Sequence, residues 1–148
     1  MANKLQFEIT TPEGKVYSEQ VDEVILPTPK GEIGILPNHI PLVSLLSPGE
    51  VRIKKNGEET YLAVSGGFIE VRPNKIIVLA DTAEHADEID EARAEAAKIQ
   101  AQELVNVKRT DDKEFAALTA KIEKEFARLK VVRRRRRRGN LPPSSGNQ

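Results

Sequence analysis

The sequence predicts a protein that is α+β by segments: an N-terminal all-β sandwich, then a C-terminal antiparallel two-helix hairpin and a disordered basic tail. Up to about residue 80, short apolar segments recur between turn residues, as is typical of β sandwiches and barrels. After Asp81 the chain becomes rich in Ala, Glu, Lys and Gln, which favour helices. The expected domain boundaries are 1–84, 85–132 and 133–148.

The strands are expected from alternation and from apolar runs. Leu5, Phe7 and Ile9 alternate with polar residues, the pattern of a half-buried strand. Asn56-Gly57 is the strongest hairpin signal, because this dipeptide tolerates the positive φ angles of a tight turn. Glycines inside strands are expected at bulges or close backbone approaches. Further strands are expected at 21–26, 33–36, 51–54, 61–64, 68–71 and 76–80.

Two helices are expected after the strands. The first covers about 87–105, and its apolar face is predicted to hold Ile89, Ala92, Ala96 and Ile99. The second begins near Asp111, which stands three residues before Glu114 as in a capping box. We expect this helix to run into the arginines and stop near Gly139, because cations are favoured at a helix C-terminus.

The second helix carries a large apolar stripe. Burying its five large side chains would contribute roughly 8–15 kcal/mol as an upper bound. We therefore expect the stripe to be covered by the sandwich, the first helix or a partner. Its members, spaced three or four residues apart, are Phe115, Leu118, Ile122, Phe126 and Leu129.

Charge is distributed unevenly. Residues 1–85 carry 8 basic and 12 acidic residues, whereas residues 86–148 carry 15 and 11, including six consecutive arginines at 133–138. The chain has no cysteine, which excludes a disulfide framework and a thiolate metal site. No secretory segment or transit peptide is visible, so we expect a bacterial or plastid-encoded chain.

The residues do not suggest catalysis. His39 and His85 are far apart in sequence, and no nucleophile elbow, metal-binding His pair or phosphate-binding loop is present. Glu84, His85, Asp87 and Glu88 are conceivable metal ligands. We prefer to interpret them as acidic decoration of a helix N-terminus, since these side chains diverge around a helix. No catalytic residue and no metal ligand is therefore assigned.

Two segments resemble the signatures of a known family. Gly31-Glu-Ile-Gly-Ile-Leu-Pro-Asn-His-Ile-Pro-Leu42 and Val64-Ser-Gly-Gly-Phe-Ile-Glu-Val71 are similar to those of the ε subunits of F-type ATP synthases. The order of sandwich and helical hairpin matches as well, so the resemblance covers about residues 3–131.

The resemblance implies a non-catalytic subunit of the central stalk in a rotary, proton-driven enzyme. The sandwich would bind the γ subunit and rest on the c-subunit ring. The hairpin would restrain ATP hydrolysis by lying on the sandwich in one state and reaching the α and β subunits in another. The protein would be peripheral to the cytoplasmic side of a bacterial plasma membrane, or to the equivalent thylakoid face. The implied γ and c-ring contacts are Gly31, Glu32, His39, Pro41 and Leu42.

The resemblance also implies two sites on the hairpin. Some members bind ATP through a motif that Ile89-Asp-Glu-Ala-Arg-Ala94 matches, so Ile89, Asp90, Arg93, Ala94 and Arg128 are candidates for a regulatory ATP site; no other cofactor is expected. A plain helix-surface ion pair between Asp90 and Arg93 is the alternative. An acidic loop of the β subunit would be contacted by Lys121, Lys124, Arg128, Lys130, Arg133 and Arg134.

The six arginines extend beyond the family pattern. We interpret them either as a solvated tail or as a stronger clamp on the acidic loop. An alternative function is an adaptor that binds nucleic acid or an acidic partner through Arg133–Arg138, with a steep salt dependence. We do not expect nucleic acid, because residues 1–132 carry 17 basic and 23 acidic residues.

Overall fold

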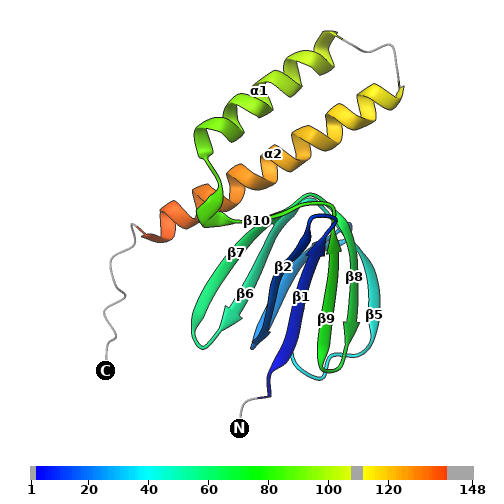
Figure 1. Ribbon diagram of the computed structural model, residues 1–148, viewed down its shortest axis with the longest axis vertical. Helices are drawn as coiled ribbons and strands as arrows, with labels where there is room; N and C mark the ends of the chain where they lie inside the picture. Colours follow the sequence, from blue (N-terminus) through cyan, green and yellow to red (C-terminus); the bar gives the residue numbers. More distant parts are fainter. Residues whose placement is uncertain (1–2, 108–111, 140–148) are drawn as a thin grey trace.

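A computed structural model describes residues 3–107 and 112–139 and confirms the sandwich and the hairpin (Figure 1). Within these residues, ten strands form two five-stranded sheets, A in the order β2-β1-β9-β8-β5 and B in the order β10-β7-β6-β3-β4. Sheet A contains β1 (Leu5–Thr11), β2 (Gly14–Val21), β5 (Leu42–Leu46), β8 (Gly67–Arg72) and β9 (Lys75–Ala80). Sheet B contains β3 (Glu23–Thr28), β4 (Gly31–Ile35), β6 (Gly49–Lys55), β7 (Glu58–Val64) and β10 (Ala83–His85).

The core lies between the two sheets and follows the predicted alternation. Leu5, Phe7 and Ile9 on β1 are fully buried, and their polar neighbours point outward. The same period of two places Val51 and Ile53 of β6 in the core. Neighbouring strands are antiparallel except for β1 and β9, which run parallel. This pair places the first strand of the sandwich beside one of the last.

The expected strand over 21–26 is in fact two strands. β2 ends at Val21 in sheet A, and β3 begins at Glu23 in sheet B, so the chain crosses between sheets at Asp22. The backbone N–H of Asp22 donates to the carbonyl of Lys54 at 2.8 Å. The apolar residues before and after Asp22 all face the core between the sheets, so in sequence they look like one continuous strand.

Two turn and glycine predictions are confirmed. Asn56 and Gly57 both have positive φ, 51° and 81°, and close the β6–β7 hairpin. Gly67 has φ 139°, and a Cβ there would lie 2.0 Å from the carbonyl oxygen of Leu79. A glycine is therefore required where β8 approaches β9.

The helical part begins later than expected. A 3₁₀ turn at Ala86–Glu88 precedes α1 (Glu91–Val107), and α2 spans Asp112–Gly139. The predicted capping pair, Asp111 and Glu114, lies outside the described side chains. Because α2 continues through the arginines, the assignment of 133–148 to a disordered tail is not correct for 133–139; residues 140–148 lie outside the described part.

The hairpin lies across one end of the sandwich. Figure 1 shows α1 antiparallel to α2, and the C-terminal half of α2 contacts β6, β7 and the 3₁₀ turn. Neither helix is both long and apolar enough over its described residues to cross a membrane.

Candidate interaction sites

A second, small core holds the hairpin against the outer face of sheet B. It is separate from the core between the sheets. Three of its members are alanines, so this contact removes less apolar surface from water than the main core does. Its seven buried residues are Tyr61, Ala63, Ala86, Ile89, Ala94, Leu129 and Val131.

The buried face of α2 differs from the predicted stripe. Leu129 is buried, but Phe115 and Phe126 are 44% and 52% exposed. The smaller Ala127 and Val131 are buried. The prediction followed side-chain size, whereas close approach to a sheet favours small residues.

The buried face of α1 also differs. Ala92, Ala96 and Ile99 are exposed, and Ile89 is buried but precedes the helix. The buried positions within α1 are Ala94 and Ala101. Alanines occur all round this helix, so their spacing alone does not identify the packed face.

Arg128 of α2 forms ion pairs with two carboxylates, one on β10 and one on α2 itself. Its Nε lies 2.6 Å from Glu84 Oε2 and its Nη1 lies 2.9 Å from Glu125 Oε2. Burial lowers the pKa of Arg128, but the two carboxylates outweigh it and raise this pKa above its ordinary value. Glu125, 4% exposed, is therefore a buried charge with a partner.

The arginine run is largely paired within the molecule. Arg133 lies 3.1 Å from Glu95 and 3.6 Å from Glu91. Arg134 pairs with Glu50 of β6, Arg135 with Asp87, and Arg136 with Glu91 at 3.6 Å. Arg137 has no ion pair among the described residues, and the Arg138 side chain is outside them. The run is therefore not the free polycation that the nucleic-acid hypothesis assumed.

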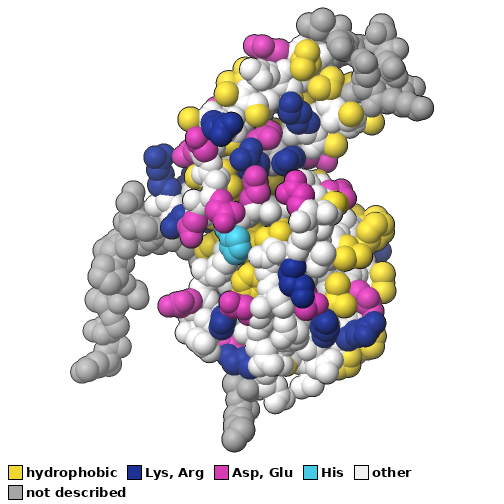
Figure 2. All heavy atoms as spheres, in the orientation of Figure 1, with side chains coloured by type: hydrophobic (Ala, Val, Ile, Leu, Met, Phe, Trp, Pro, Cys, Tyr) yellow, Lys and Arg dark blue, Asp and Glu magenta, His cyan; other side chains and the backbone are white. Residues whose placement is uncertain are grey.

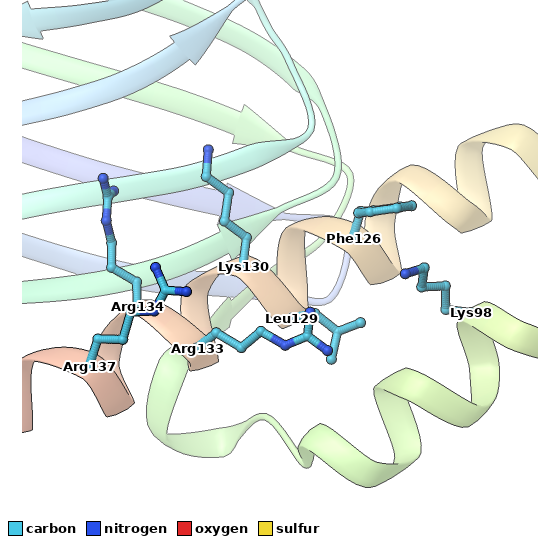
Figure 3. Close-up of a pocket in the computed structure, with 7 residues that line it drawn as sticks. All are labelled: Lys98, Phe126, Leu129, Lys130, Arg133, Arg134 and Arg137. Atoms are coloured by element: carbon cyan, nitrogen blue, oxygen red, sulfur yellow. The ribbon is translucent and has the colours of Figure 1, made fainter. Parts of the chain in front are cut away.

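A cationic cleft of about 490 Å³ opens between α1 and the exposed side of α2. Lys98 Nζ lies 4.0 Å from the centre of the Phe126 ring, a cation–π contact between the helices. In Figure 3, Lys130 and Arg134 point away from the helix in the same direction, and Arg133 extends past Leu129. The lining residues are Lys98, Phe126, Leu129, Lys130, Arg133, Arg134 and Arg137.

The residues of the ATP motif take structural roles in this conformation. Asp90 caps α1, because its Oδ1 accepts from the N–H groups of Ala92 at 3.0 Å and Arg93 at 3.2 Å. Ile89 and Ala94 belong to the small core. Arg93 is exposed and has no ion pair with any described residue, so the Asp90–Arg93 pair offered as an alternative is absent from the described contacts. Asp90, Arg93 and Arg128 do not line the cationic cleft.

The residues assigned to the acidic-loop contact fall into two groups. Arg128, Arg133 and Arg134 have carboxylate partners within the chain. Lys121 and Lys130 are exposed, Lys124 is half-buried, and no described carboxylate lies within ion-pair distance of the three. An external acidic surface therefore has direct access to the lysines in this conformation.

Of the residues assigned to γ and the c ring, His39, Pro41 and Leu42 lie at the end of the sandwich opposite the hairpin, whereas Gly31 and Glu32 lie at the other end of β4, beside Thr28 and Pro27. The Asn38 N–H donates to the Pro73 carbonyl at 2.6 Å and fixes the β4–β5 loop beside the β8–β9 turn, which is at the bottom of Figure 1. His39 Nδ1 lies 2.7 Å from the Ile40 carbonyl oxygen, and Glu32 accepts from Arg52 at 2.6 Å. All five residues are exposed or half-buried, but β4 separates Gly31 and Glu32 from His39, Pro41 and Leu42, so the five do not form one surface.

An exposed apolar patch beside this loop was missed. Leu45 pairs with Phe68, and Phe68 with Leu79, so the three form a row across β5, β8 and β9 on the outer face of sheet A. Figure 2 shows apolar side chains gathered on this side of the sandwich. Non-alternating runs such as 42–46 are the sequence signal, since they make both strand faces apolar. With exposures of 53% to 75%, the patch consists of Leu36, Ile40, Val43, Leu45, Phe68 and Leu79.

The four conceivable metal ligands have other neighbours. Glu84 pairs with Arg128, Asp87 pairs with Arg135, and the His85 ring lies 6.3 Å from that of Tyr17. The described residues contain no group of three or more His, Asp or Glu side chains arranged to hold an ion.

Comparison with known proteins gives consistent matches for both parts. Residues 4–86 match the family model "ATP synthase, Delta/Epsilon chain, beta-sandwich domain", and residues 87–133 match its "long alpha-helix domain". An ATP synthase epsilon chain of Herpetosiphon aurantiacus is 46% identical over 134 residues, covering 90% of this chain and 98% of that one. The equivalent from Acidithiobacillus ferridurans is 45% identical over 139 residues, covering 94% and 98%.

Solved structures share the fold. A chain in the mitochondrial ATP synthase of Euglena gracilis, determined as OSCP/F1/c-ring, matches with a TM-score of 0.73 at 21% identity, covering 84% of this chain and 78% of that one. A chain from the central stalk and c-ring structure of Tetrahymena thermophila ATP synthase matches with a TM-score of 0.62 at 14% identity, covering 88% and 97%.

Proposed function

The chain belongs to the ATP synthase delta/epsilon chain family, and we propose that it is a non-catalytic subunit of the central stalk. In this proposal the sandwich binds the γ subunit and rests on the c ring, which couples the catalytic head to proton flow during ATP synthesis. The hairpin inhibits ATP hydrolysis when it leaves the sandwich and reaches the α and β subunits. The protein is then peripheral to the membrane through its complex, on the cytoplasmic face in bacteria or the equivalent thylakoid face.

The division of the molecule into two ends carries this proposal. The end away from the hairpin presents the β4–β5 loop, and the apolar patch extends from this loop along the outer face of sheet A, which is the kind of surface that an obligate partner covers. The other end holds the hairpin through a core of seven residues and several ion pairs. A permanent anchor and a detachable element are what coupling and regulation require.

Truncation of the hairpin tests the inhibitory role. An enzyme assembled with residues 1–87 in place of the full chain keeps the sandwich core, so we expect normal co-purification with γ and the c ring. ATP hydrolysis by this enzyme should rise several-fold over that of the enzyme with the full chain. Equal hydrolysis rates with equal subunit content would contradict the inhibitory role.

We further propose that ATP is a regulatory ligand of the hairpin, through Ile89, Asp90, Arg93, Ala94 and Arg128. Binding of phosphate by Arg128 competes with Glu84 and Glu125, which hold this guanidinium at 2.6 and 2.9 Å. Equilibrium dialysis of the full chain with labelled ATP should give saturable binding below millimolar concentration, and Arg93→Gln should weaken it. Linear, unsaturated uptake by the unmodified chain is the contrary result.

We propose that the acidic loop of the β subunit is met first by Lys121, Lys124 and Lys130, which are free of described carboxylates. Arg128, Arg133 and Arg134 join only after they leave their partners within the chain. Contact with the head is therefore an exchange of ion pairs, which costs little free energy at the exposed pair of Arg133 with Glu95 and more at Arg128 and Arg134, whose partners Glu125 and Glu50 are buried.

A further inference from the structure

Glu50 is a buried carboxylate between the sandwich and the hairpin. It is 1% exposed and lies on the outer face of sheet B, because its neighbour Val51 points into the main core. Its Oε1 accepts from Arg134 of α2 and lies 3.5 Å from Arg52 Nε. No donor of a described residue reaches its Oε2.

Arg52 does not neutralise Glu50 fully. Its Nη2 donates to Glu32 at 2.6 Å, and its Nε, at 3.5 Å from Glu50, has no hydrogen-bond partner among the described residues. The close partner of the buried carboxylate is therefore Arg134, which belongs to the hairpin and not to the sandwich.

We propose that Arg134 and Glu50 form a latch that makes docking of the hairpin on sheet B conditional on this one ion pair. The proposal assigns a regulatory contact within the arginine run and rests on the hairpin movement proposed above. The element that docks on sheet B is the chain's own α2, which packs on the outer face of β6 and β7.

The latch acts through desolvation. Docking covers Glu50 with α2, and a buried carboxylate without a cation is strongly unfavourable, whereas a buried pair contributes little net stability. When the hairpin leaves, Glu50 returns to the surface and is hydrated. Arg134 therefore determines where α2 can dock on sheet B, and it adds little to the free energy of docking.

The other arginines of the run at 133–138 do not have this property, and the pair of Arg128 with Glu84 of β10 involves a carboxylate that is 35% exposed. Arg133 and Arg136 pair with Glu91 and Glu95 of α1, so they fasten one helix to the other and not the hairpin to the sheet. Arg135 pairs with Asp87, whose side chain is 70% exposed, and such pairs are screened by salt. Arg137 is exposed and serves as a matched control, because its removal changes the charge equally.

Spin labels can report the docked distance in the full chain. The protein has no cysteine, so cysteines introduced at Gln20 on β2 and Gln100 on α1, both exposed, can be labelled selectively. Distance distributions by double electron–electron resonance are then compared for the parent, Arg134→Gln, Glu50→Gln, the double variant and Arg137→Gln. Hydrogen exchange of the β1 and β9 amides reports whether the sandwich remains folded.

Arg134→Gln should add a population at longer distance, about tenfold or more above that of the parent, with sandwich exchange unchanged. Removing the carboxylate as well, in the Glu50→Gln/Arg134→Gln variant, should restore the docked distance, and Arg137→Gln should match the parent. The proposal is overturned if Arg134→Gln and Arg137→Gln give the same distribution, or if the double variant is as open as Arg134→Gln. A rescue by the double variant, without any effect of Arg134→Gln on hydrolysis by the assembled enzyme, supports the latch and refutes only its inhibitory use.

Discussion

Asp22 connects three parts of the fold through one carboxylate. Its Oδ1 lies 2.5 Å from Lys4 Nζ, and its Oδ2 accepts from the Asn56 N–H at 2.7 Å. The side chain thus joins the start of β1, the crossing between sheets and the β6–β7 turn. The hydrogen bond from Lys4, together with that from the Asn56 backbone, lowers the pKa of Asp22 below its ordinary value of 3.8.

Asp22→Asn should remove a pH-dependent part of the stability. Since the folded pKa is lowered, the contribution of Asp22 is present above pH 3.8 and is lost as pH falls from there through the folded pKa. Urea unfolding should therefore show the variant less stable than the parent at pH 7, with the difference shrinking below pH 3.8. Glu13→Gln, at a carboxylate without a described ion pair, is the control. A difference that stays constant with pH would contradict the assignment.

At the scale of elements, two cores of different size set two levels of stability. The sheets share a core of Leu, Ile, Val and Phe side chains, whereas the hairpin is held by the small core around Leu129 and Val131. Because the two cores share no buried residue, we expect the hairpin to open at a lower free-energy cost than the sandwich.

Leu129→Ala should open the hairpin selectively. Leu129 is 2% exposed, and truncating a buried leucine typically costs about 2–5 kcal/mol. We expect hydrogen exchange of the α1 and α2 amides to accelerate by at least about tenfold, with the exchange of β1 and β9 unchanged. Phe126→Ala, at a residue 52% exposed, should change exchange by less than about threefold. Equal acceleration in the helices and the strands would mean that the two parts unfold together.

At the scale of the whole molecule, the exposed apolar patch lies on sheet A and the hairpin lies on sheet B. Phe68→Ser should therefore change the unfolding free energy of the free chain by less than about 0.5 kcal/mol relative to the unmodified chain, since Phe68 is 58% exposed. The same change should lower co-purification with γ and the c ring. Thr10→Ser, in the same row of sheet A beyond Leu79, is the matched control. Normal recovery of γ with Phe68→Ser would show that the patch is not the anchoring surface.

The main core was predictable because it follows from short-range pattern. The alternation on β1 and the turn at Asn56-Gly57 depend only on neighbours in sequence, and the structure confirms both predictions. β2 was missed because its apolar residues Val16, Tyr17 and Val21 do not alternate with polar ones. The packed helix faces were missed because burial of Ala127 and Val131 depends on where α2 crosses sheet B, and burial of Ala94 depends on where α1 meets α2. No local sequence pattern encodes either position.

For the candidate sites, the sequence indicated which residues to consider but not which of them lie together in the structure. The segment from Gly31 to Leu42 comprises strand β4 and the β4–β5 loop, and its assignment to γ and the c ring stays a prediction. The row of Leu45, Phe68 and Leu79 arises from strand pairing between residues distant in sequence. The arginines were expected to be solvated or to clamp another subunit. Their pairing with Glu50, Asp87 and Glu95 depends on where α2 crosses the sandwich.

The parallel pairing of β1 with β9 also fixes an order of events during synthesis. β1 leaves the ribosome first, yet its neighbour in sheet A is available only after residues 75–80 have emerged. Until then, only the hairpin of β1 and β2 can form in this half of sheet A. The helices are translated last, so α2 follows β6 and β7, the strands that it packs against, out of the ribosome.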